Sequence, residues 1–331
     1  MAAYKDLIGQ KITKVTSNPG EPKTGQMWYN STSGTLRGLG ILEAWTSASP
    51  TIVARDKAGA AGTQTALLAI GGDTALTSVD EYNGTGWKSA PAINTGRHGM
   101  ASGGTTSAAW KAGGNPPATT TATEEYDGSS WTTVPGTLNT GRYILGSCGT
   151  QTAALCNGGY NGSANVNNSE EYNGTSWSEG NNINTTRRTL TNFGIQTAAV
   201  TYGGLTTTYV ASVEEYDGTS WTSVTNYPTN VSDSAASGTL TAGLAFGGNV
   251  PPGTTATKKY DGTSWTASPA SLATAAKRSG GTPAGSDTAA VNFGGDGPGS
   301  HVTTTEEYNK STNTITAAAW ASGGALNTAR D

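Results

Sequence analysis

Cysteine, histidine and charge are all scarce in this sequence of 331 residues, and each shortage excludes a class of protein. The two cysteines, Cys148 and Cys156, fall in one expected hairpin but out of register for a cross-strand bond, so we expect buried free thiols and no disulfide framework. Charged residues make up only 13% of the chain, the net charge is −4, and no basic patch is present. Nucleic acid is therefore not an expected partner.

Long hydrophobic runs are missing as well. The first residues, MAAYKDLIGQKITKVTSNPG, contain no continuous apolar segment, so we expect neither a signal peptide nor insertion into a membrane. Hydrophobic residues reach only 34%, a share that would favour disorder if the aromatic residues were scattered. The aromatic residues are regularly spaced instead, and the 9 Trp and 13 Tyr supply large surfaces for burial.

What the chain has in abundance is an internal repeat of about 44 residues, present six times between residues 55 and 320. Its first segment reads GTQTALLAIGG at 62–72 and recurs at 104–114, 149–159, 194–204, 238–248 and 285–295. Its second segment reads EEYDGTSW at 214–221 and recurs at 80–87, 124–131, 170–177 and 258–265, with the variant EEYNKSTNTIT at 306–316. A residue placed in every repeat is a better candidate for building the repeat than for chemistry.

Each repeat predicts four short antiparallel strands, which we name a to d. Strand a is expected to begin at an arginine and is rich in Gly and Ala, which suits a crowded position near a ring axis. Strand b alternates and predicts one well-buried face. Strand c ends in a Tyr, an Asn-Gly or Asp-Gly turn follows in five repeats, and strand d begins at a Trp.

These glycine pairs, the Tyr before the turn and the Trp after it resemble the pattern of the kelch-repeat β-propellers. The resemblance implies an all-β fold of six blades, each with four antiparallel strands, over residues 25–331 with the six repeats at about 52–320. Residues 1–24 would form a short N-terminal extension. Residues 25–45 read as a hairpin that either closes the six-bladed ring or belongs to an incomplete seventh blade, because Trp45 precedes Arg55 by the same ten residues as Trp87 precedes Arg97.

The residues that look catalytic favour a structural interpretation. The pair Glu124/Glu125 recurs at 170–171, 214–215 and 306–307, and neighbours on a strand point to opposite faces, so they cannot act together as acid and base. The two histidines, His98 and His301, lie in different elements without the spacing of metal ligands. We therefore expect no catalytic residue, no metal and no cofactor.

The repeated arginines allow two interpretations. They lie seven residues before the Gly of the a–b turn in five repeats, and Val231 takes the place in the remaining one. A ring of guanidinium groups at one mouth of the central channel would bind an anionic group such as a carboxylate or sulfate. Pairing of each arginine with an acid or carbonyls is the favoured alternative, because repetition indicates structure. The candidates are Arg55, Arg97, Arg142, Arg187 and Arg278.

The loops between strands b and c vary in length and content, whereas the a–b and c–d turns are short and uniform. Variable loops on a rigid scaffold are the usual place of recognition, and their Asn, Tyr, Thr and Ser content is typical of an adaptable binding surface. The alternative interpretation is that these loops vary only through ordinary sequence drift at solvent-facing positions. The candidate ligand-binding residues in these loops are Asn115, Tyr160, Asn161, Tyr209, Asn249 and His301.

The N-terminal segment NPGEPKTGQMWYNSTSGTLR at 18–37 resembles a segment of bacteriophage virion proteins, especially fibre-like and other surface-attached ones. The resemblance implies attachment to other virion proteins, capsid or tail, through residues 1–45. The candidate attachment residues are Tyr4, Leu7, Ile8, Ile12 and Val15.

Three functions follow. The preferred hypothesis is a non-enzymatic phage virion protein, located on the particle surface as a decoration or fibre, whose loops bind a host-surface glycan. A glycan-active enzyme is the second, and it predicts a non-repeated acid or histidine cluster at the channel mouth, which the sequence does not reveal. A kelch scaffold for protein interaction is the third. Assembly into a homo-oligomer is compatible with the preferred hypothesis.

Overall fold

The computed structural model describes residues 13–20, 26–115, 117–297 and 300–316 and contains almost only β-strands. It divides into two compact units, Met1–Leu42 with Lys310–Asp331, and Glu43–Asn309. The second unit is a six-bladed β-propeller, which confirms the predicted fold. The start at residue 25 stays a prediction, and Glu43 and Trp45 both contact the fifth blade, at Lys259 and Thr257.

Strands of equivalent position recur around the propeller. Strands a are β4 (Gly59–Thr63), β8 (Ala101–Thr105), β12 (Gly146–Thr150), β16 (Thr191–Ile195) and β20 (Ala235–Thr239). Strands b are β5 (Ala66–Ile70), β9 (Ala108–Ala112), β13 (Ala153–Asn157), β17 (Ala198–Tyr202), β21 (Ala242–Phe246) and β24 (Ala289–Phe293). Strands c are β6 (Val79–Tyr82), β10 (Thr123–Tyr126), β14 (Ser169–Tyr172), β18 (Val213–Tyr216), β22 (Thr257–Tyr260) and β27 (Thr305–Thr316). Strands d are β7 (Trp87–Ala90), β11 (Trp131–Val134), β15 (Trp177–Glu179), β19 (Trp221–Ser223), β23 (Trp265–Ala267) and β3 (Thr35–Ala48).

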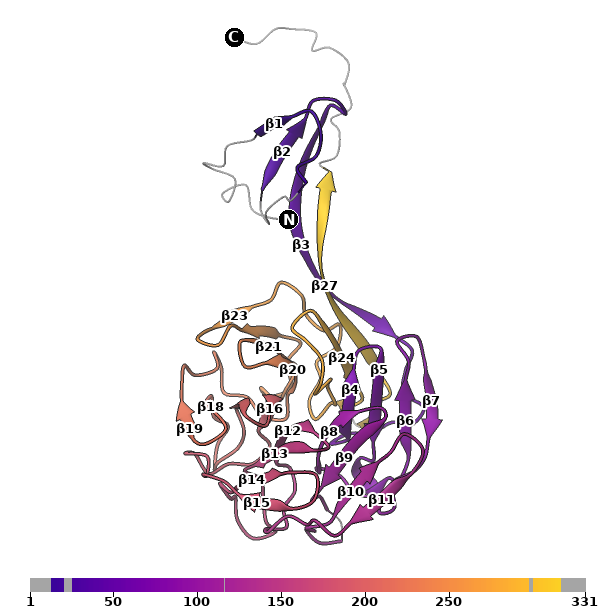
Figure 1. The fold of residues 1–331 in the computed structure, drawn as a ribbon, viewed down its shortest axis with the longest axis vertical. Coiled ribbons are helices and arrows are strands. Elements are labelled where there is room, and N and C mark those ends of the chain that lie inside the picture. The colour runs from indigo at the N-terminus through magenta and orange to yellow at the C-terminus, as the bar shows by residue number, and fades with distance from the viewer. Residues whose placement is uncertain (1–12, 21–25, 116, 298–299, 317–331) are drawn as a thin grey trace. The chain divides into compact units, whose positions relative to one another are not determined.

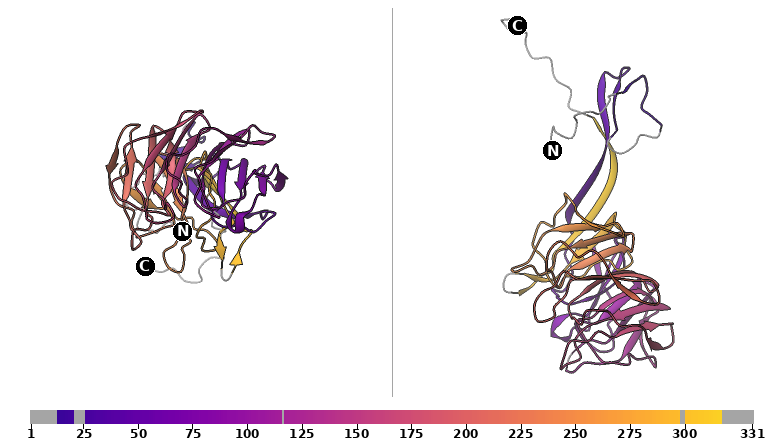
Figure 2. Two further views of the ribbon diagram at one scale, coloured as in Figure 1. Left: turned by 90° about the horizontal axis from the view of Figure 1, so that it is seen from below. Right: turned by 90° about the vertical axis from the view of Figure 1, so that its left-hand side faces the viewer.

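The first five blades are four-stranded antiparallel meanders in the order a-b-c-d. Figure 1 shows strands such as β8, β12 and β16 around the centre of the propeller and strands such as β11, β15 and β19 on its rim. The further views in Figure 2 show how the sheets of successive blades face one another. A meander places the a–b and c–d turns at one end of each blade and the b–c loops and d–a connections at the other.

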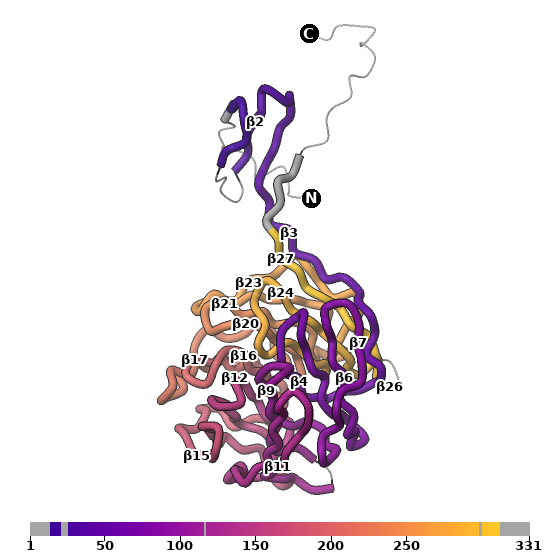
Figure 3. The backbone as a smooth tube through the Cα atoms, turned by 45° about the vertical axis from the view of Figure 1, so that its right-hand side comes forward, coloured from indigo at the N-terminus to yellow at the C-terminus, as the bar shows by residue number. Residues whose placement is uncertain are grey.

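The sixth blade is completed by the end of β3, from Glu43 to Ala48, which favours closure of the ring over an incomplete seventh blade. Its sheet has the order β1-β2-β3-β27-β24, so the end of β3 is the outer strand beside β27. The indole of Trp45 lies against Phe246 of the fifth blade and Tyr308 of the sixth, with ring centroids 4.8 Å and 5.4 Å away. Figure 3 traces β3 and β27 side by side. The ring therefore closes by pairing the two ends of the repeat region, without a seventh blade.

The predicted inner strand is wrong in two respects. Arg55 and its equivalents lie four residues ahead of strand a, in the connection from the previous blade, because a left-handed residue turns the chain between them. The sixth blade has no regular strand a. There Pro283 cannot donate to a ladder, and Gly280 pairs only through an isolated bridge to Phe293, packed where a Cβ would meet the phenyl ring at 2.1 Å.

Strand b is buried on both faces, whereas the sequence predicted one buried face. In β5, for example, the four residues Leu67 to Ile70 are all fully buried. The reason is that each blade is covered by a blade on either side, so both faces of its middle strands are inside the core. Cys148 and Cys156 are buried free thiols, as predicted, and burial raises the pKa of Cys148 to about 12.

A repeated hydrogen bond links the strand-d tryptophan of four blades to the neighbouring blade. The indole N–H of Trp177 donates to Thr123 Oγ1 at 3.0 Å, and Trp45 donates to Thr257 Oγ1 at 2.9 Å, which confirms that Trp45 occupies a strand-d position. The partner is always the first residue of the neighbouring strand c. Where that residue is Val79 or Val213, the indole N–H of Trp131 or Trp265 has no hydrogen-bond partner among the described residues.

The acid pairs are also explained by blade contacts. The second acid accepts a hydrogen bond from the Tyr of the next blade, as Glu125 does from the Tyr172 hydroxyl at 2.7 Å. The fifth blade has Lys259 at this position, and Glu43 supplies the missing carboxylate, 2.6 Å from the Lys259 ammonium. The structural interpretation of the pairs is thereby supported by their geometry.

The other unit contains β1 (Thr13–Val15), β2 (Met27–Asn30) and the start of β3. β1 pairs parallel to β2, with Val15 opposite Asn30, and β2 and β3 form the predicted hairpin. Of the predicted attachment residues, Val15 lies in β1, and Tyr4, Leu7, Ile8 and Ile12 lie outside the described residues. In the part of the chain that the structure describes, no helix has the length and apolar character needed to cross a membrane.

Candidate functional site

Four of the five candidate arginines are buried in ion pairs inside their own blades. The partners are 2.7 Å apart for Arg55 and Asp80 and 2.6 Å apart for Arg187 and Glu214, and Arg97–Glu124 and Arg142–Glu170 repeat the arrangement. These side chains are at most 4% exposed. Burial lowers the pKa of Arg55, Arg97 and Arg187. Each pair holds the connection ahead of strand a against strand c, so no guanidinium of the four faces the channel mouth.

The fifth blade lacks both members of the pair. It has Val231 where the first four blades have arginine, and Lys258 where they have the first acid. A buried charge left without its partner is strongly destabilising, and in the sixth blade the first acid, Glu306, accepts a hydrogen bond from the Ala273 amide at 2.7 Å instead.

Arg278 is different from the other arginines, although its offset from the glycine pair is the same. Ala276 takes the structural place of the buried arginine, because its carbonyl meets Gly247 as the Arg97 carbonyl meets Gly71. The sixth repeat is two residues longer between this place and the following Gly285, which shifts Arg278 to the mouth of the channel. There its side chain is 36% exposed.

A closed ring of six backbone hydrogen bonds surrounds the channel mouth. Each blade contributes one residue whose N–H donates to the carbonyl of its neighbour, at 2.6–3.0 Å. All six have a left-handed φ of 48–58°, an uncommon conformation for residues other than glycine. In order of hydrogen-bond donation the residues are Lys57, Arg278, Asp233, Thr189, Ile144 and Gly99.

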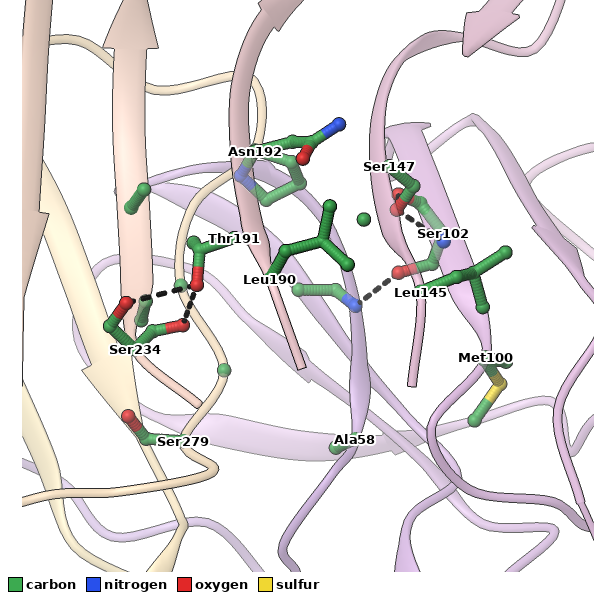
Figure 4. A pocket seen from close by; sticks show the side chains of 17 residues that line it. Ala58, Met100, Ser102, Leu145, Ser147, Leu190, Thr191, Asn192, Ser234 and Ser279 are labelled. Carbon is green, nitrogen blue, oxygen red and sulfur yellow. Dashed lines mark hydrogen bonds between the residues drawn. The ribbon is translucent and has the colours of Figure 1, made fainter. Parts of the chain in front are cut away.

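Below this ring the channel itself is narrow. Its cavity of about 140 Å³ is lined by small side chains from all six blades, including Ala60, Ser102 and Ser147. Figure 4 shows these hydroxyls engaged with neighbouring blades, as in the hydrogen bonds between Thr191 and Ser234 and between Ser102 and Ser147. The hydroxyls therefore stitch the inner strands together and leave little room for a ligand.

A larger pocket of about 360 Å³ opens at the mouth, over blades 3 to 5. It brings together three of the candidate loop residues, Tyr160, Tyr209 and Asn249, with Arg278 at its edge. The Asn249 amide donates to the Tyr209 hydroxyl at 2.8 Å, which orients both groups.

Two further residues of this pocket were not predicted. Tyr143 lies edge-to-face with Tyr160 at a centroid distance of 5.8 Å, and the guanidinium of Arg188 lies 4.9 Å from the centre of the Tyr160 ring. Both directly follow a buried repeat arginine. The signal in the sequence is that the residue after this arginine differs in every repeat, while the arginine itself recurs.

On the other side of the mouth, blades 1, 2 and 6 form a cluster of acids and histidines. His98 Nδ1 lies 3.2 Å from Asp73 Oδ1, and His301 Nδ1 lies 3.4 Å from Asp56 Oδ1. Asp73 is in the short helix η2 (Asp73–Ala75), and His301 is in β26 (Ser300–His301), which pairs with β25 (Asp296–Gly297). The fold thus assembles the non-repeated cluster that the sequence did not reveal, because its members are far apart in the chain.

Burial shifts the pKa values of the acids and of the histidine His98 in this cluster in opposite directions. Burial raises the pKa of Asp56 and lowers that of His98. Burial alone would raise the pKa of Asp73 too, but a hydrogen bond from the Thr74 amide and the Lys57 ammonium at 3.3 Å hold it below its usual value.

The remaining loop candidates do not join the pocket. Asn115 forms a backbone bridge with His98 beside the cluster. The Asn161 side-chain oxygen accepts hydrogen bonds from the backbone amides of Ser163 and Ala164, both at 2.9 Å, and so caps its own turn.

Comparison with known proteins supports the fold alone. No protein-family model matches the sequence, and no curated protein matches it. The solved structure of YjhT is similar, with a TM-score of 0.67 and 13% sequence identity over 80% of this chain and 99% of that one. At this identity the likeness shows a common propeller architecture, and activity must be argued from the site.

Proposed function

We propose that this chain is a bacteriophage virion surface protein whose propeller binds a host-surface glycan at the channel mouth without covalent chemistry. The observation that carries the glycan part is the mouth pocket, where Tyr143, Tyr160, Tyr209, Arg188 and Asn249 converge. Aromatic faces accept the C–H-rich faces of sugars, and amide and guanidinium groups donate hydrogen bonds to their hydroxyls.

The pocket residues are also not repeated from blade to blade, as expected of residues that bind a ligand rather than build the blades. Tyr160, Tyr209 and Asn249 come from b–c loops that differ between repeats, while the scaffold beneath them is the same in each blade. The ring of backbone hydrogen bonds holds Ile144 and Thr189 at the pocket floor. A rigid floor with non-repeated side chains favours recognition of one ligand over a purely structural role.

The virion part of the proposal draws on the resemblance of residues 18–37 to phage virion proteins and on the two-unit organisation. Binding by one unit leaves the other, with β1 and β2, for attachment to capsid or tail proteins. Electron cryo-microscopy of particles that contain this chain tests it. We expect residues 1–42 against a virion protein and the channel mouth accessible to solvent; a free chain absent from particles would contradict the proposal.

The glycan part is tested by an array of host-surface glycans followed by titration of the best ligand. We expect Tyr160→Ala and Arg188→Ala each to weaken binding by at least about tenfold, which is about 1.4 kcal/mol. Tyr29→Ala and Arg37→Ala, the same changes in β2 and β3, are the matched controls and should bind as the wild type does. Equal losses in the controls, or none in the pocket variants, would remove the pocket from the proposal.

A glycan-active enzyme is the second candidate, because the mouth does hold a non-repeated cluster of acids and histidines. Ligand atoms of Asp56, Asp73 and His301 all lie within 4.8 Å of one another, a separation compatible with paired carboxylates. Asp56, however, is only 1% exposed and hardly accessible to a sugar. Mass spectrometry of bound glycans after long incubation decides: an altered glycan that Asp73→Asn no longer yields would favour the enzyme.

A further inference from the structure

The cluster at the mouth contains a carboxylate that the fold leaves without hydrogen bonds. Both oxygens of Asp56 are buried and have no hydrogen-bond partner among the described residues, and the same holds for Nδ1 of His301. A buried polar group without a partner is costly, and the great majority of such groups in proteins are satisfied by protein, water or an ion. His301 Nδ1 lies 3.4 Å from Asp56 Oδ1, and unsatisfied atoms this close together indicate a missing ligand.

The chemistry of the donor set indicates a cation. One ligand atom from each of Asp56, Asp73 and His301 lies within 4.8 Å of the other two. Bonds from zinc to imidazole nitrogen or carboxylate oxygen are about 2 Å long, so side-chain shifts of about 1 Å would bring all three around one ion. We propose that Asp56, Asp73 and His301 bind a divalent transition-metal ion of the zinc class at the channel mouth.

Mixed imidazole and carboxylate donors favour zinc and similar ions over magnesium or calcium, which prefer oxygen ligands alone. Asp73 and His301 are 28% and 34% exposed, so the ion enters from their side, with Asp56 at the floor. His98 Nδ1 lies 3.2 Å from Asp73 Oδ1 and acts as a positioning residue that orients this carboxylate.

Two cations now stand near the site and compete with the metal. The Lys57 ammonium lies 3.3 Å from Asp73 and 3.8 Å from Asp56, and the Arg278 guanidinium lies 3.9 Å from Asp56. Neither is hydrogen-bonded to Asp56, and Lys57 has a flexible stem with 21% of its side chain exposed, so it can turn toward solvent. The Lys57 and Arg278 side chains also line the pocket proposed for the glycan. A bound metal ion would repel both cations toward the glycan.

Isothermal titration of the full chain with zinc chloride tests the proposal, with magnesium chloride as the metal control. We expect saturable binding of one zinc ion and a raised melting temperature, because an ion that binds only the folded state stabilises it. Asp56→Asn and His301→Gln should each weaken zinc binding by at least about tenfold. Asp217→Asn is the matched control, since Asn occupies the equivalent turn position in the first and third blades.

Lys57→Met gives a second measurement that does not depend on removing a ligand. Loss of the competing ammonium should tighten zinc binding by at least about threefold. The proposal is overturned if the wild type shows no saturable binding, if His301→Gln binds as tightly as the wild type, or if magnesium binds as tightly as zinc. Since His301 is partly exposed, the fold of His301→Gln should be intact, and circular dichroism checks this.

Discussion

Arg187 and Arg188 are neighbours in the chain but belong to two differently constructed regions. The Arg187 side chain is fully buried against Glu214 inside the fourth blade, in an arrangement that three other blades repeat. Arg188 reaches the mouth pocket and contacts the Tyr160 ring, and no other blade has an arginine at the equivalent position. Recurrence therefore marks the positions that build the blade, and the positions beside them are free to carry recognition.

The largest expected effect comes from breaking the buried pair. Arg187→Ala leaves Glu214 buried without its partner and should lower the free energy of unfolding by about 3–5 kcal/mol. Arg188→Ala should change it by less than about 0.5 kcal/mol. Urea denaturation followed by tryptophan fluorescence measures both, and similar losses from the two variants would show that the buried ion pair does not set Arg187 apart from Arg188.

A double variant sharpens the same comparison. Arg187→Val combined with Glu214→Lys reproduces the pair found in the fifth blade at Val231 and Lys258. We expect the double variant to be more stable than Arg187→Val alone, because no unpaired carboxylate remains buried. A further loss on adding Glu214→Lys would show that the fifth blade depends on other compensation.

The next largest change in stability is expected at Lys111, a charged residue in strand b (β9) of the second blade. Its ammonium is fully buried, 2.7 Å from Glu124, which also pairs with Arg97. Burial, with repulsion from Arg97, lowers the pKa of Lys111 from 10.5 to about 8. Between these values the unfolded chain keeps the proton that the folded chain has lost, so raising the pH favours folding.

Lys111→Met should remove this dependence. Relative to the variant, the wild type should gain roughly 1 kcal/mol of stability per pH unit above pH 8. Thermal melts of both proteins at pH 7.5, 8.5 and 9.5 measure the difference. A difference that does not vary with pH would mean that Lys111 stays charged in the folded protein.

The smallest effect concerns the indole hydrogen bonds. Thr123→Val removes the acceptor of the Trp177 indole and should lower the free energy of unfolding by about 1 kcal/mol. Val79→Thr offers an acceptor to the unpartnered Trp131 indole and should raise it by a smaller amount. Chemical denaturation checks both, and opposite signs are required; a stabilised Thr123→Val would contradict the role assigned to this contact.

Much of the fold was predictable from particular residues. Tyr172, Trp177 and the turn between them recur in five repeats, and that pattern places strands c and d without reference to distant contacts. The position of Trp45, ten residues before Arg55, indicated that the N-terminal hairpin takes part in closing the propeller ring. The choice between six and seven blades required the structure, because it depends on which strand pairs with β27.

The candidate site was predictable only in part. Tyr160, Tyr209 and Asn249 were found because they lie in variable loops, and Tyr143 and Arg188 were missed because they follow a repeated residue. Arg278 was assigned to the wrong set, since two extra residues in the sixth repeat shift it from the buried position to the ring.

The blade is determined by the sequence alone, because glycine pairs, turn dipeptides and aromatic spacing act over a few residues and recur in at least five of the six copies. Tertiary structure alone decided what lies at the channel mouth. Asp56, Asp73, His98 and His301 come from three blades, and His301 joins the others only when the ring closes between the sixth blade and the first. No local pattern encodes that meeting, because the distances involved are set by closure of the whole ring.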